Sequence, residues 1–243
     1  MNVIEAIGVR KSFDHGPVHV DAVSGIDLEV RAGELLAIVG PSGSGKSTLL
    51  SMLGGIETPT SGKILLEGTD MASLNDDQRT LLRRRRIGFI FQAFNLIPTL
   101  TAIENVSLPL ELDGVAESAA RQRASDSLRQ VDLADRRDHL PSMMSGGEQQ
   151  RVAVARSLVI QPAVLLADEP TGNLDSISGL QVTRLLRDLV DLHGQTVVII
   201  THDMHVAGQA DRIVRVRDGH LEQEEPSHGR RPLAMPVAQS ARK

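Results

Sequence analysis

Residues 35–48 read LLAIVGPSGSGKST. The first part, Leu35–Val39, is a continuous apolar run, which is typical of a strand buried on both faces of a sheet. The second part, Gly40–Thr48, fits the pattern GxxxxGK(S/T), in which backbone N–H groups and the start of the following helix surround phosphate oxygens. An ordinary glycine-rich turn has no reason to combine a buried strand with the ending Lys46-Ser47-Thr48. The stretch therefore predicts a phosphate-binding loop.

The composition is that of an ordinary globular protein with no nucleic-acid-binding surface. The 243 residues are 41% hydrophobic and 23% charged, and the net charge is −5. Aromatic residues make up 2%, so few rings are present to stack on bases. The run Arg83–Arg86 is better explained as the cationic end of a helix over residues 76–84. We therefore expect no nucleic-acid partner.

The sequence predicts neither a membrane-spanning segment nor a disulfide or zinc cross-link. The longest apolar runs have the length of a strand, far short of the ~20 residues that a membrane helix needs. The first residues have neither the basic region nor the apolar run of a signal peptide. The chain has no Cys, which excludes disulfides and thiolate zinc sites. If the protein works at a membrane, other chains must hold it there.

Strands and helices alternate along most of the chain. Alternating or continuous apolar patterns predict strands over residues 3–9, 18–30, 35–39, 62–68, 87–91, 164–167 and 196–200. Helical patterns cover residues 46–53, 76–84, 101–131, 146–159 and 177–192. This order predicts an α/β fold with a mostly parallel sheet, preceded by an antiparallel β element. The stretch over about 95–160 is too long for a simple crossover, so we expect it to form an inserted helical subdomain.

The last residues differ in composition from the rest. Residues 226–243 contain three prolines, no periodic pattern and four basic residues without an acid. Such a composition favours a disordered tail, so the folded domain is expected to cover residues 1–225. A role of the basic tail at a membrane surface or a partner is the less favoured alternative.

Two carboxylates follow the predicted strand at 164–167. Asp168, at the strand end, is placed to hold a metal ion through its water shell, and Glu169 to polarise an attacking water. Lys46 is expected to reach the β- and γ-phosphates, and Ser47 to place its hydroxyl on Mg²⁺. Alone, an acidic pair would indicate only a turn; together with the phosphate-binding loop it predicts nucleotide hydrolysis.

A second glycine-rich helix start lies at Ser145-Gly146-Gly147. Ser145 is a natural N-cap, and taken alone the segment would be no more than the beginning of a helix. A helix start with bare glycines also binds phosphate. Because the chain already contains one phosphate-binding loop, the second predicts a nucleotide shared between two copies of the chain.

These segments together resemble the ATPase subunits of ABC transporters, to about residue 225. Residues 144–149, Met-Ser-Gly-Gly-Glu-Gln, resemble the signature motif of that family, which usually reads Leu-Ser-Gly-Gly-Gln. Met144 replaces Leu with similar volume, and Glu148 stands where Gln is common. The resemblance implies a P-loop NTPase (RecA-like) core that binds and hydrolyses ATP with Mg²⁺.

The resemblance also implies roles for single residues. Gln92 corresponds to the Q-loop glutamine, 173–175 to the D-loop and His202 to the switch histidine that senses the γ-phosphate. Phe13 stands where an aromatic ring stacks on adenine, with a core Phe as the alternative. The implied catalytic residues are Lys46, Gln92, Glu169 and His202, and the implied metal ligands are Ser47, Gln92 and Asp168. The implied nucleotide-binding residues are Phe13, Gly40, Pro41, Ser42, Gly43, Ser44, Gly45, Lys46, Ser47, Thr48, Ser145, Gly146 and Gly147.

Residues 87–98 and 104–110 resemble the lipoprotein-release and macrolide-export branch of the family. This implies that the chain pairs with a second copy and with integral membrane permease subunits, at the cytoplasmic face of the cell membrane, and drives export or extraction of a substrate. One alternative is the ATPase of a non-transport membrane machine, such as one acting in cell division. A soluble ABC ATPase acting on DNA or ribosomes is disfavoured, because such proteins usually carry two ATPase domains or a long insert. The cargo and its direction stay open.

Overall fold

A six-stranded sheet forms the centre of the computed structural model, which describes residues 1–15 and 18–226. The strand order is β10-β9-β3-β8-β7-β6, and all neighbours are parallel except the antiparallel pair β9–β10. The strands are β3 (Leu35–Val39), β6 (Ile87–Phe91), β7 (Val164–Asp168), β8 (Thr196–Ile200), β9 (Arg212–Arg217) and β10 (His220–Pro226). The mostly parallel sheet agrees with the prediction from the sequence.

A smaller antiparallel sheet contains the N-terminus. Its order is β2-β1-β4-β5, with strands β1 (Asn2–His15), β2 (Val18–Arg31), β4 (Ser61–Leu66) and β5 (Thr69–Asp70). The predicted antiparallel element is therefore present. It is larger than expected, because β4 and β5 come from beyond the phosphate-binding loop: β4 pairs with β1, and β5 pairs with β4.

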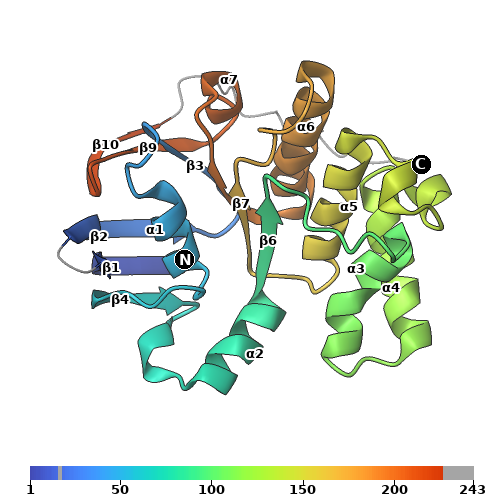
Figure 1. Ribbon diagram of the computed structural model, residues 1–243, viewed down its shortest axis with the longest axis horizontal. Coiled ribbons are helices and arrows are strands. Elements are labelled where there is room, and N and C mark those ends of the chain that lie inside the picture. The colour runs from blue at the N-terminus through green and yellow to red at the C-terminus, as the bar shows by residue number, and fades with distance from the viewer. Residues whose placement is uncertain (16–17, 227–243) are drawn as a thin grey trace, which may run out of the picture.

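Helices flank the central sheet, and three of them stand apart from the antiparallel sheet (Figure 1). The group on that far side is α3 (Ala102–Leu112), α4 (Glu117–Gln130) and α5 (Gly146–Leu158). It is the predicted helical insert, whose first part splits into two helices at Gly114, in the left-handed conformation. The other helices are α1 (Lys46–Leu53), α2 (Asp76–Arg86), α6 (Ser176–His193) and α7 (Met204–Ala207), with short 3-10 turns at Met71–Ser73, Ala134–Arg136 and Pro141–Met143.

The central sheet separates two hydrophobic cores. In β3, Leu36 and Ile38 belong to the core shared with α1 and the antiparallel sheet. Leu35, Ala37 and Val39 belong to the core shared with α3 to α6. Because successive side chains point to opposite faces, a strand covered on both sides must be apolar throughout. The strand Leu35–Val39 is apolar along its whole length for this reason.

The arginine run ends α2 and makes local contacts. The helix runs to Arg86, two residues further than predicted, and all four arginines lie in its last turn. Their partners are the Gly55 and Leu112 carbonyls and the carboxylates of Asp113 and Glu67. This supports the interpretation of the run as a helix end.

The last described strand extends one residue into the predicted tail. Pro226 closes β10 opposite Arg212, whereas the sequence placed it in the tail. The remainder of the predicted tail, 227–243, lies outside the described residues. Among the residues that are described, no helix has both the length and the apolar character needed to cross a bilayer.

Candidate functional site

The loop between β3 and α1 has the backbone that phosphate binding needs. Gly45, the N-cap of α1, has a φ of 96°, and a Cβ there would lie 2.0 Å from the Ala22 carbonyl oxygen. A side chain at this position is therefore excluded by both strain and space. Within the described residues, no side chain caps α1. The first N–H groups of the helix thus stay available to an anion.

Lys46 is buried and its ammonium group lies inside the loop. It donates to the carbonyl oxygens of Gly40 at 2.9 Å and Pro41 at 2.7 Å. These acceptors are neutral, so phosphate oxygens would bind the ammonium more strongly. The geometry fits the predicted phosphate contact.

Ser47 and Asp168 meet at the ends of α1 and β7. The Ser47 hydroxyl donates to Asp168 Oδ1 at 3.3 Å. Burial raises the pKa of Asp168, and the hydrogen bond from Ser47 acts in the opposite direction. A hydroxyl and a carboxylate are hard oxygen ligands of the kind that Mg²⁺ prefers. The residues present therefore fit the predicted metal ion.

Glu169 and His202 form a pair at the ends of β7 and β8. Glu169 Oε1 lies 2.9 Å from His202 Nδ1. The hydrogen bond that Glu169 accepts from the imidazole, together with the negative charge of Glu169, raises the pKa of the otherwise exposed His202. Glu169 itself has a φ of 46°, a strained conformation for a residue with a side chain. The sequence predicts roles for both residues but gives no sign that they touch.

Gln92 is bonded to the predicted D-loop. Its side-chain amide donates to Asn173 Oδ1 at 3.1 Å, and the Asn173 amide donates to the Gln92 carbonyl at 3.0 Å. The glutamine thus links the end of β6 to the predicted D-loop. Its role as a metal ligand stays a prediction.

Ser145 caps α5 through a reciprocal pair of hydrogen bonds. Its hydroxyl oxygen accepts from the Glu148 N–H at 3.2 Å, and Glu148 Oε2 accepts from the Ser145 N–H at 2.8 Å. Glu148 also contacts Arg136 at 3.2 Å, and these interactions, led by the Ser145 N–H, lower its pKa. A carboxylate suits this helix start better than an amide.

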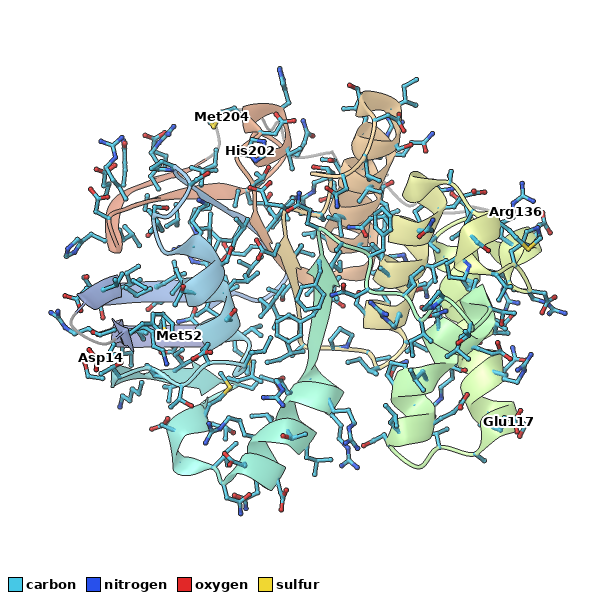
Figure 2. All side chains as sticks on the ribbon, viewed as in Figure 1. Asp14, Met52, Glu117, Arg136, His202 and Met204 are labelled. Carbon is cyan, nitrogen blue, oxygen red and sulfur yellow. The ribbon has the colours of Figure 1, made fainter. Side chains whose placement is uncertain are left out.

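The two predicted phosphate-binding helix starts belong to helices on opposite faces of the central sheet. The apolar side chains of α1 pack in the core shared with the antiparallel sheet, and those of α5 pack in the core shared with α3, α4 and α6. In Figure 2, His202 lies beside α7, and Arg136, which contacts Glu148 of α5, lies at the opposite side of the view.

Phe13 lies half-buried on β1 rather than in a core. The Lys11 ammonium lies 5.0 Å from its ring centre. The alternative of a core Phe is therefore wrong, because neither hydrophobic core includes it. Stacking on adenine stays a prediction.

The surface has one cleft beside the phosphate-binding loop and a second, larger groove at the helical insert. A cleft of about 240 Å³ runs beside the phosphate-binding loop, lined by Gly40, Pro41, His202, Met204 and Arg217 among others. A larger open groove of about 470 Å³ lies where α2 and β6 meet the helical insert. The larger hollow is thus not at the catalytic residues, and it needs an explanation of its own.

Two polar residues of α5 were missed by the sequence reasoning. Gln150 is fully buried and binds the carbonyls of Phe91 and Pro170. Arg156 donates to the carbonyls of Phe94 and Asn95, in the loop after β6. In the sequence, the only indication of each residue is a long polar side chain on a helix face that is otherwise apolar. That signal shows burial but does not show the partner.

Comparison with known proteins gives consistent results. The ABC transporter family profile matches residues 23–172. The lipoprotein-releasing system ATP-binding protein LolD of Pseudomonas syringae is 46% identical over 219 residues, 90% of this chain and 96% of that protein. The macrolide export ATP-binding/permease protein MacB of Brucella melitensis is 50% identical over 213 residues, 88% of this chain but only 33% of that protein.

A solved structure agrees over almost the whole chain. The ATP-binding cassette MJ0796, a dimer in a post-hydrolysis state bound to ADP and Pi, is 41% identical with a TM-score of 0.85. The match covers 93% of this chain and 99% of that one. With its P-loop core, its helical insert and this degree of similarity, the chain belongs to the ABC transporter family.

Proposed function

We propose that two copies of this ABC ATPase close head to tail around two ATP molecules. Each ATP would contact Lys46 and Ser47 of one copy and Ser145 and Gly147 of the other. The observation that supports this is that α1 and α5, whose starts are the two predicted phosphate-binding regions, lie on opposite faces of the central sheet. The related MJ0796 cassette is also a dimer, in a post-hydrolysis state bound to ADP and Pi.

The chemistry is mainly positioning and charge stabilisation. Lys46 and the loop N–H groups would bind the phosphate oxygens, and Glu169 would orient the attacking water and accept its proton. His202, held by Glu169, would contact the γ-phosphate. Mg²⁺ bound by Ser47 and Asp168 would neutralise charge on the β- and γ-phosphate oxygens.

We further propose that the ATPase works with integral membrane permease subunits, at the inner face of the cell membrane. The relatives that support this are named as a macrolide export ATP-binding/permease protein and a part of a lipoprotein-releasing system. Export or extraction of a substrate is the work that fits these names.

The large groove is the proposed contact with the permease. Stacked rings of Phe89 and Phe91, 5.7 Å apart, form part of its wall beside Arg83 and Arg156. In the described part of the chain, these arginines bind carbonyl and hydroxyl oxygens and no carboxylate. Burial lowers the pKa of Arg156. An amphipathic segment carrying an acidic side chain would complete both the apolar and the charged part of this surface.

The test of the dimer is Glu169→Gln. The amide cannot accept the proton of water, so the variant should bind ATP, lose turnover and accumulate as an ATP-bound dimer. Gel filtration with ATP and Mg²⁺ measures this. Glu117→Gln, on α4 away from His202 in Figure 2, is the control and should behave as the unchanged protein. A Glu169→Gln variant that stays monomeric at high concentration would contradict the head-to-tail dimer.

The test of the groove is charge reversal at Arg84→Glu, since Arg84 also lines the groove. The variant should lose recovery with the membrane fraction that contains the permease, while its ATPase rate without the permease stays unchanged. Arg123→Glu, at an exposed position of α4 outside the groove, is the matched control. Equal recovery of both variants would show that the permease binds elsewhere.

A further inference from the structure

Gln150 joins α5 to the ends of two strands of the central sheet. Its side chain is fully buried. The amide nitrogen donates to the Pro170 carbonyl at 2.6 Å and to the Phe91 carbonyl at 3.2 Å. Two carbonyl acceptors require the NH₂ group, so the orientation of the amide is determined by its partners.

The two carbonyls belong to residues next to the catalytic ones. Phe91 precedes Gln92 at the end of β6, and Pro170 follows Glu169 after β7. Gln92 is in turn bonded to Asn173. A single side chain from the helical insert therefore holds the two segments that carry Gln92 and Glu169.

Packing alone does not explain a glutamine here. Its Oε1 atom is buried and has no hydrogen-bond donor among the described residues. Buried polar atoms are nearly always paired, and leaving one unpaired lowers stability. A Met or Leu side chain would fill a similar volume without an unpaired atom. The amide is therefore explained by the two carbonyls it holds.

The position along α5 connects the two nucleotide sites of the dimer. Gly147, at the start of the helix, lies against Ser178 of α6, and Gln150 follows it after one helical turn. The first turn of α5 presents Ser145 and Gly147 to the nucleotide on the other copy. The next turn holds the strand ends that position Glu169 for the nucleotide on its own copy.

We propose that Gln150 is a positioning residue, which fixes Glu169 and Gln92 relative to the signature helix so that the two sites of the dimer are set together. The inference rests on the assignment of Glu169 to the attacking water. It concerns the rate of hydrolysis, because the hydrogen bonds that Gln150 makes in the described part of the chain go to Phe91 and Pro170 and not to the phosphate-binding loop.

The test is Gln150→Met, which keeps the volume and removes both donors. Steady-state hydrolysis of ATP with Mg²⁺ should show kcat reduced about tenfold or more, with KM within about twofold, because transition-state positioning is lost and ground-state binding is kept. Gln150→Asn keeps the amide on a side chain one methylene shorter and can reach at most one carbonyl. Its kcat should lie between those of Gln150→Met and the unchanged protein.

Ser127→Ala is the matched control. Ser127 is buried on α4, and its hydroxyl donates to the Ala155 carbonyl of α5, so the variant loses a buried bond to the same helix without touching β6 or β7. It should keep its kcat even where its thermal midpoint falls as far as that of Gln150→Met. If Gln150→Met does not fold, Gln150→Asn compared with Ser127→Ala decides the question.

Two results would overturn the inference: an unchanged kcat in Gln150→Met, or a loss of kcat that Ser127→Ala shares at the same thermal midpoint. Glu169→Gln in the same assay distinguishes a wrong assignment of Glu169 from a wrong role of Gln150. If Glu169→Gln keeps its turnover, the assignment of Glu169 is wrong. If it loses turnover while Gln150→Met does not, only the role of Gln150 is wrong.

Discussion

At the scale of the residue, Gly147 shows how closely the signature segment packs in its own chain. A Cβ at this position would lie 2.8 Å from Ser178 Oγ and 2.9 Å from Ser178 Cβ. The Ser178 hydroxyl is itself bound to Asp175 at 2.6 Å, so it is not free to move aside. Gly147→Ala should therefore lower the free energy of unfolding by about 1–3 kcal/mol through overpacking. Chemical denaturation of the ATP-free chain measures it.

Gly146→Ala is the control for this prediction. The nearest atoms to a Cβ there are 3.5 Å and 3.6 Å away, in ordinary contact. Since alanine favours a helix more than glycine does, this variant should be as stable as the unchanged chain or more so. Equal losses in both variants would mean that the helix start, and not the contact with Ser178, limits the position.

The individual nucleotide residues differ in how far the sequence predicts them. Lys46 and Ser47 follow from a pattern of eight residues whose geometry is local, and the structure has the loop in that form. Phe13 depended on resemblance alone, and the structure excludes its alternative as a core residue without testing the stacking on adenine. Gln92 lies at the expected strand end, but its side chain faces Asn173.

At the scale of the element, the end of α2 is held to the turn after β4 by Arg86 and Glu67. Two hydrogen bonds, at 2.6 Å and 2.7 Å, join the guanidinium to the carboxylate. The bonds from Arg86 lower the pKa of Glu67. Both side chains are over a third exposed, so the pair is worth at most about 1 kcal/mol.

The pH dependence of this pair follows from the lowered pKa of Glu67. The stabilisation is present above the unfolded pKa of Glu67 and is lost as the pH falls through its folded value. Arg86→Met should therefore lower the thermal midpoint at pH about 7 and make little difference at pH about 3. Arg123→Met, at an exposed position on α4, is the control. An equal effect of Arg86→Met at both pH values would indicate that packing of the arginine stem matters more than its charge.

Helix starts were readable from the sequence because their hydrogen bonds are local. Ser145 caps α5 with Glu148 three residues later, and Thr101 and Glu104 form the same arrangement at α3. Four strands of the central sheet, β3, β6, β7 and β8, were predicted nearly to the residue, since each is short and mostly apolar. Strands β9 and β10 were not predicted, because their exposed face carries charged residues and interrupts the apolar pattern.

At the scale of the whole molecule, the proposed site needs two copies, and a mixing experiment separates their contributions. Lys46→Ala should weaken ATP binding to its own copy. Ser145→Arg should keep ATP binding near normal and abolish hydrolysis, because a bulky cation would fill the helix start that approaches the ATP of the other copy. ATP titration and ATPase rates of each variant test these expectations.

A mixture of the two variants should regain activity. A dimer with one copy of each contains one site with an intact Lys46 and an intact Ser145, so an equal mixture should reach up to about a quarter of the original rate. Mixing each variant with itself is the control. If the mixture stays inactive, or if both variants lose ATP affinity equally, the assignment of Ser145 to the nucleotide of the other copy is wrong.

The sequence by itself determined the features that depend on neighbours along the chain. These are the buried strand, the phosphate-binding loop, the helix caps and the alternation that indicates a parallel sheet. Only the tertiary structure decided which distant residues meet. Glu169 and His202 are 33 positions apart, and Gln150 and Phe91 are 59 apart. These contacts follow from the strand order β8-β7-β6 and from the packing of α5 on it. That order results from burial of both sheet faces, a property of the whole chain which no local pattern encodes.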